Sequence, residues 1–139
     1  SFQKLKEVFE VSSHLVRLTG KLAAERITDE ELADIRNRIS EMRLVEDNQT
    51  LIRLDGEIHK IINKASKNDV LVKILGWLHD QAVRIWAFTG IIDNYWIDLA
   101  EEFEDIVNAL EDHDGKAVAS LLERHAKRFV ENISRQLTF

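Results

Sequence analysis

The sequence contains no proline and no cysteine. Average usage of about 5% would place roughly seven prolines in a chain of this length, and helix interiors are the segments that tolerate proline least. The missing cysteines exclude disulfides, thiolate metal sites and cysteine nucleophiles, and they are compatible with a cytoplasmic location. The composition therefore favours long helices and excludes function classes that depend on a thiol.

An excess of positive charge is also missing. The chain has 19 Lys and Arg against 25 Asp and Glu, and its net charge is −6. Phosphate contacts dominate affinity for nucleic acids, so an acidic domain of this kind is a poor DNA binder by itself. No apolar run approaches the length of a membrane span and no signal peptide is visible, so we expect a cytoplasmic protein without a membrane partner. The chain begins at Ser1 and its only methionine is Met42, from which we expect a missing upstream segment.

The sequence contains enough apolar residues to form one hydrophobic core. The 139 residues are 45% hydrophobic and 32% charged, which suits a single globular domain over residues 1–139. Apolar residues recur at three- and four-residue steps, with no alternating strand-like segment. We predict an all-α, antiparallel bundle of about six helices joined by short connections. The expected helices run from residue 2 to about 26, from the Thr28 cap through Met42, over residues 51–65 with a cap at 47 or 48, from 69 to about 88, from 93–94 through 110, and along the stripe from Val118 to Ile133.

The expected helices carry recognisable start signals. Thr28 and Glu31 have the spacing of a capping box, in which the hydroxyl and the carboxylate each serve a backbone amide of the first turn. Asp47 or Asn48 can cap the third helix, and Asn68 the fourth. The fourth helix is apolar on more than one face, which predicts contact with the core on one side and with something else on another.

The third helix places two polar side chains on its inward face. Asp55 and His59 share the stripe of Leu51, Ile58 and Ile62. A carboxylate buried without a partner costs several kcal/mol, roughly, so Asp55 requires a proton, a hydrogen-bond donor or a metal beside it. A spacing of one turn lets Asp55 and His59 bind one ion, and a buried side-chain hydrogen bond is the alternative.

A third inward polar residue stands on the last helix. His125 shares the apolar stripe of Val118, Leu122, Phe129 and Ile133. Taken alone, a buried histidine is more often a hydrogen-bonded core residue than a metal ligand. His14 and His79 have no convergent partner in the sequence, and His113 lies in an acidic turn, so we expect all three at the surface.

Three segments together resemble a known family. The runs LAAERITDEELADIRNRISEM, LDGEIHKII and EDIVNALEDHDGKAVASLLERHAKR occur in the order and at the intervals seen in the FCD domain, the C-terminal effector domain of FadR-like GntR-family bacterial transcription regulators. The resemblance implies a dimerising, non-enzymatic domain that binds a small carboxylate-type metabolite in a helical cavity. It also implies that DNA is bound only through an N-terminal winged helix-turn-helix head, which this chain lacks.

The resemblance further implies a divalent metal, such as zinc or nickel, held by Asp55, His59 and His125. Phe103 occupies the position of a further family histidine, so three ligands remain. These three either form a zinc site with an open coordination position or are the relic of a lost site. Phe103 also makes the expected cavity more apolar, which makes it a candidate effector-binding residue. Arg84 is a second candidate, as a donor to an effector carboxylate, with an exposed or interface arginine as the alternative.

Two other function classes fit less well. A di-iron enzyme in a helical bundle uses Glu-x-x-His pairs, whereas Gly56 stands three residues before His59 and Leu122 three before His125. A purely structural interaction bundle would have a dry, fully packed interior, whereas a polar cavity beside Asp55 would favour a sensor. Finally, the apolar surplus of the fourth helix, with the family's use of paired half-sites, predicts a homodimer.

Overall fold

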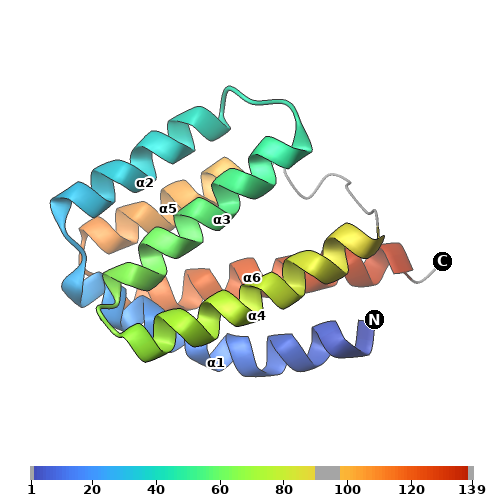
Figure 1. Ribbon diagram of the computed structural model, residues 1–139. Coiled ribbons are helices and arrows are strands. Elements are labelled where there is room, and N and C mark those ends of the chain that lie inside the picture. Colours follow the sequence, from blue (N-terminus) through green and yellow to red (C-terminus); the bar gives the residue numbers. More distant parts are fainter. Residues whose placement is uncertain (1, 90–97, 138–139) are drawn as a thin grey trace.

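The computed structural model describes residues 2–89 and 98–137 (Figure 1). In these ranges the chain forms helices and no strand, which confirms the predicted all-α bundle. The helices are α1 (Phe2–Arg26), α2 (Asp29–Met42), α3 (Asn48–Ala65), α4 (Asp69–Thr89), α5 (Leu99–Glu111) and α6 (Gly115–Leu137). None of the helices in the described part of the chain is long and apolar enough to cross a membrane.

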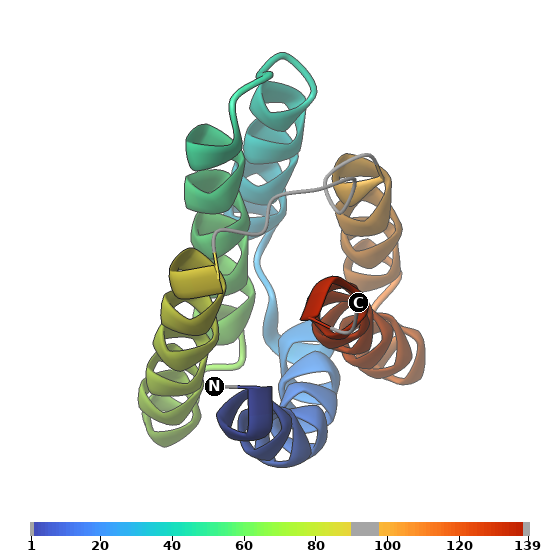
Figure 2. The ribbon, with the colours of Figure 1, turned by 90° about the vertical axis from the view of Figure 1, so that its right-hand side faces the viewer.

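The bundle is arranged around α1. This helix packs against α4 on one side and α6 on the other, while α2, α3 and α5 lie above them (Figures 1 and 2). The contact between α1 and α6 is very close at Gly20, where an added Cβ would lie 2.7 Å from the backbone nitrogen of Ala119. Glycine is therefore required at this position by the approach of a second backbone.

The predicted helix starts are present. Thr28 and Glu31 form the reciprocal capping box at the start of α2, and the Asp47 side chain accepts a hydrogen bond from the Thr50 amide at the start of α3. Asn68 accepts one from the Leu71 amide at the start of α4. The expected start of the fifth helix, at residues 93–94, lies outside the described residues; within them, α5 begins at Leu99.

The inward stripes form one main core with a smaller cluster beside it. The main core unites α2, α3 and α5 with the inner faces of α1 and α6, and the smaller cluster lies around Leu5 and Ile133. The fourth helix has the predicted second apolar face, because Val70, Ile74 and Trp77 remain 68%, 42% and 56% exposed. The described bundle therefore buries a full core and still leaves an apolar stripe on α4 uncovered.

Candidate functional site

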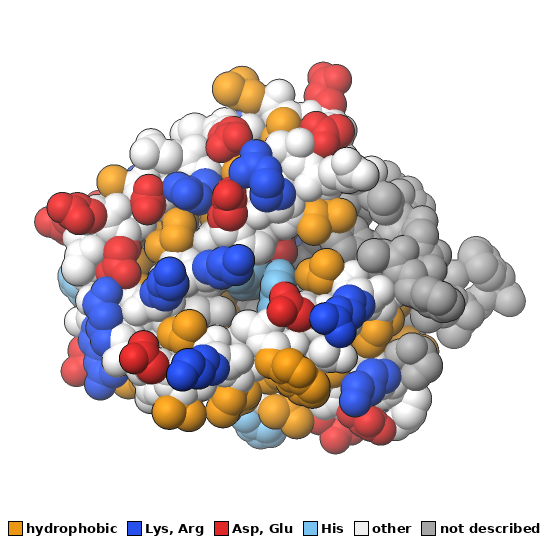
Figure 3. Space-filling view, viewed as in Figure 1, with side chains coloured by type: hydrophobic (Ala, Val, Ile, Leu, Met, Phe, Trp, Pro, Cys, Tyr) orange, Lys and Arg blue, Asp and Glu red, His pale blue; other side chains and the backbone are white. Residues whose placement is uncertain are grey.

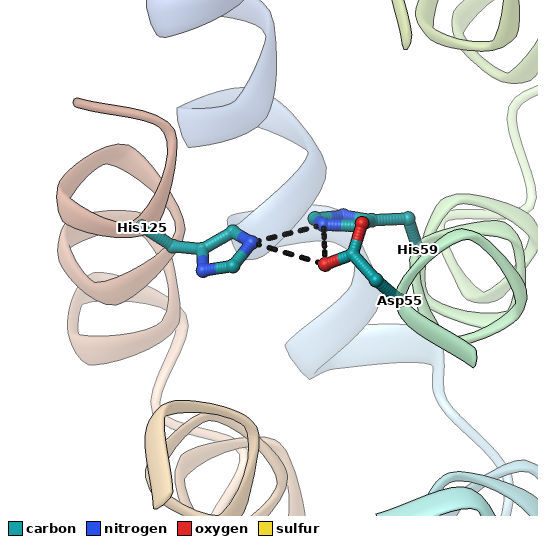
Figure 4. A group of neighbouring side chains, drawn as sticks. All are labelled: Asp55, His59 and His125. Atoms are coloured by element: carbon teal, nitrogen blue, oxygen red, sulfur yellow. Dashed lines mark hydrogen bonds and ion pairs between the residues drawn. The ribbon is translucent and has the colours of Figure 1, made fainter. Parts of the chain in front are cut away.

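Helices α3 and α6 bring three polar side chains to one point (Figure 4). The Nε2 atoms of His59 and His125 lie 3.1 Å apart, and each is 3.5 Å from Oδ1 of Asp55. The side chains are mostly buried, with exposed fractions of 13% for Asp55, 21% for His59 and 6% for His125. Among the described residues they form the group of potential metal ligands whose ligand atoms all lie within 4.8 Å of one another.

The three atoms have the dimensions of a zinc site. Their triangle is almost equilateral, and its centre lies about 2 Å from each corner, close to the zinc–nitrogen and zinc–oxygen bond lengths of about 2.0–2.2 Å. Two imidazole nitrogens and a carboxylate oxygen are also a common ligand set for divalent transition ions. Three protein ligands leave coordination positions open, as in catalytic and sensing sites rather than purely structural ones.

The charge of the Asp55 carboxyl depends on the two histidines that face it. Burial by itself would raise the pKa of Asp55, but its interactions with His59 and His125 outweigh burial and hold that pKa far below its usual range. The buried Oδ1 lies 3.5 Å from both Nε2 atoms, yet it has no well-aligned hydrogen bond among the described residues. A buried anionic oxygen of this kind favours an ion as its partner.

His125 is oriented from its other side by Glu102. Its Nδ1 lies 2.7 Å from Oε1 of Glu102, which in turn forms an ion pair with Arg128. A carboxylate can only accept, so we assign the ring proton to Nδ1, and the lone pair of Nε2 then points toward Asp55 and His59. Metal-bound histidines are commonly held in this way by an outer carboxylate.

A cavity of about 120 Å³ adjoins the three ligand atoms, between α1, α3, α4 and α6. Seventeen described side chains line it, and eleven of them are apolar. The polar ones are Ser12, Asp55, His59, Asn63, His79 and His125. Figure 3 shows histidine side chains in a hollow on the face where α3 and α4 lie, with Lys and Arg side chains around it.

Comparison with known proteins now identifies the fold family. The sequence profile of the FCD domain family matches residues 7–128 of this chain. The chain belongs to the FCD domain family. Its structure also resembles that of the protein titled Streptococcus agalactiae GntR, with a TM-score of 0.75 and 20% sequence identity. The match covers 91% of this chain and 58% of that one, so the FCD domain described here spans less than two thirds of that protein. No curated protein matches the chain.

The two residues predicted to contact an effector occupy different surroundings in this FCD domain. Phe103 is fully buried, and its ring centroid lies 5.5 Å from that of His59 and 5.0 Å from that of His125. Arg84 has an exposed side chain. Neither is among the described residues that line the cavity, so the structure brings Phe103 to the histidines and does not bring Arg84 to them.

The expected surface position of His79 is wrong. His14 and His113 are exposed as predicted, but His79 lines the cavity, with its ring centroid 5.4 Å from that of His59. Burial, followed by the charge of His59, lowers the pKa of His79 and favours its neutral form. Its spacing from Leu75 and Ala82, both on the inner face of α4, was the signal in the sequence that indicated this position.

Sequence reasoning also missed Glu102. Three glutamates occur within four residues of α5, at positions 101, 102 and 104. Nothing local distinguishes the one that faces His125, because the contact depends on how α5 is rotated against α6. The predicted trio was accessible from spacing and resemblance, whereas its outer partner required the packed structure.

Proposed function

We propose that this FCD domain is the sensing part of a dimeric bacterial transcription regulator, and that it binds a small carboxylate effector on a divalent ion held by Asp55, His59 and His125. The observation that carries the proposal is the convergence of three ligand atoms, one of them a buried carboxylate oxygen without a well-aligned hydrogen bond, on the wall of a cavity. A fully packed interior, which would favour a purely structural bundle, is not what the described residues form.

Each part of the site has a separate task. Asp55, His59 and His125 hold the ion, and Glu102 fixes the ring of His125. The ion, when bound, supplies the positive charge that attracts an anionic effector. The cavity beside it offers space for the rest of the effector. Zinc and nickel are the ions that this ligand set suits.

The effector signal would be carried through the bundle to the second subunit and to a DNA-binding head on the N-terminal side. Effector binding and head orientation are then two sites coupled through one set of helices. The exposed stripe of Val70, Ile74 and Trp77 on α4 supports the dimer, because an apolar helix face of this kind is usually covered by a partner.

Zinc titration of the metal-free chain tests the proposal. An ion that binds only the folded state must raise the melting temperature, and at a concentration 100 times its Kd the gain is about 2.7 kcal/mol. His59→Ala and His125→Ala should each abolish the rise, whereas His14→Ala, which removes an exposed histidine of α1, should leave it unchanged. A parent chain that shows no rise well above micromolar zinc, or an equal response in either site variant, would disprove the metal site.

A further inference from the structure

The walls of the cavity differ in chemistry. All three residues that α3 contributes are polar, namely Asp55, His59 and Asn63. All eleven apolar lining residues come from α1, α4 and α6, among them Phe9, Leu78 and Phe129. Each of these three helices also adds one polar side chain, Ser12, His79 or His125. A bound molecule therefore meets only polar groups on the α3 side and mostly hydrocarbon on the other sides.

The charge available to a ligand is limited to that of the ion. The described cavity wall contains no Lys and no Arg. A divalent ion together with the ionised Asp55 leaves one positive charge, which one carboxylate neutralises. A second carboxylate on the same ligand would lie against an apolar wall without a cationic partner, and burying a charge in this way is strongly unfavourable.

We propose that the effector is a monocarboxylate with an apolar body, such as a short aliphatic or aryl-substituted acid. Its carboxylate faces α3, and its hydrocarbon part lies between α1, α4 and α6. The inference rests on the proposed function, because it assumes that the ion is bound, and it excludes dicarboxylates as the preferred class.

Calorimetric titration of the zinc-loaded chain with a series of simple acids tests the monocarboxylate inference. Butanoate, hexanoate and octanoate vary the apolar body, while adipate and suberate match the last two in carbon number and add a second carboxylate. Each buried methylene should tighten binding about three- to fourfold until the cavity is filled. Hexanoate and octanoate should each bind at least about ten times more tightly than the dicarboxylate of equal length.

A variant pair locates the hydrocarbon part. Ala82, on α4, lines the cavity, whereas the neighbouring Gln81 does not. Ala82→Leu should weaken octanoate more than butanoate and leave the zinc-induced rise in melting temperature intact. Gln81→Leu adds a leucine outside the cavity and should leave the whole acid series unchanged.

The outcomes separate this inference from the proposal on which it rests. Adipate binding as tightly as hexanoate, or affinity that does not depend on chain length, overturns the monocarboxylate inference while the sensor survives. If zinc stabilises the chain but no acid in the series binds, the monocarboxylate inference fails and the metal site stands. If zinc itself has no effect, both proposals fail.

Discussion

Glu102 acts on the proposed metal site through His125. It lies 2.7 Å from Nδ1 of that ring, on the side opposite the ligand atom, and its own position is fixed by Arg128. An outer carboxylate of this kind selects the tautomer and increases the basicity of the metal-binding nitrogen. The residue is therefore a positioning residue, which acts on the proposed site through the ring of His125.

We predict that Glu102→Gln weakens zinc binding about 10- to 100-fold. The amide keeps the size of the side chain but loses the charge that holds the Nδ1 proton, so His125 adopts the productive tautomer less often. Calorimetric zinc titration measures the loss. Glu101→Gln is the matched control, because Glu101 is the neighbouring residue and is paired with Arg43 on the surface. Equal zinc affinities in the two variants would contradict the orienting role.

At the scale of single helices, the start of α2 is tied to the connection between α3 and α4. Glu31 accepts hydrogen bonds from the Thr28 amide at 3.0 Å and from Nζ of Lys67 at 2.9 Å. Partial burial alone would raise the pKa of Glu31, but the hydrogen bonds from Lys67 and Thr28 outweigh it and lower that pKa below its ordinary value of 4.5. The folded state therefore favours the charged form.

The sign of the resulting pH dependence follows from that shift. A lowered pKa means that the unfolded chain binds more protons, so this contribution is present above pH 4.5 and is lost as the pH falls through the folded-state value. Glu31→Gln should reduce the free energy of unfolding by about 1 kcal/mol at pH 7 and by much less in acid. Urea unfolding at several pH values measures this. Glu30→Gln, which alters an exposed neighbour, should show no such difference.

The close packing of α1 against α6 depends on Gly20. A Cβ at Gly20 would lie 2.7 Å from the backbone of Ala119, whereas a Cβ at Gly76, in α4, meets nothing within 4 Å. Gly20→Ala should force the two helices apart and lower the free energy of unfolding by about 1–3 kcal/mol.

Gly76→Ala is the matched control for that substitution. It should raise stability by up to about 1 kcal/mol, because alanine has the higher helix propensity and finds open space. Thermal or urea unfolding compares the two variants directly. If Gly20→Ala proves as stable as Gly76→Ala, α1 and α6 are not held at the distance described here.

At the scale of the whole molecule, the α4 stripe predicts association of two copies. Val70, Ile74 and Trp77 lie on one face of that helix and are exposed. Light scattering should give a dimer mass for the parent chain. Trp77→Glu should shift it to a monomer, since a charge on an apolar interface must be desolvated. Leu44→Glu, at an isolated residue that is 85% exposed, should leave the dimer intact. A concentration-independent monomer mass for the parent would remove the proposal.

The local features of this protein were accessible from the sequence alone. Helix positions follow from apolar steps of three and four, and the caps at Thr28, Asp47 and Asn68 depend on hydrogen bonds that span three residues. The shared face of Asp55 and His59 is likewise a property of one helix, because residues four apart always lie one above the other. Family membership, too, was visible in three runs of sequence and is confirmed by the FCD match.

Only the tertiary structure decided which distant residues meet. The 3.1 Å approach of His125 to His59, which the family resemblance only implied, and the choice of Glu102 among its neighbouring glutamates depend on how α3, α5 and α6 are rotated about their axes. The rotation of α4 leaves Arg84 exposed. No local pattern sets these angles; they follow from packing the helices together so that the core is filled without voids.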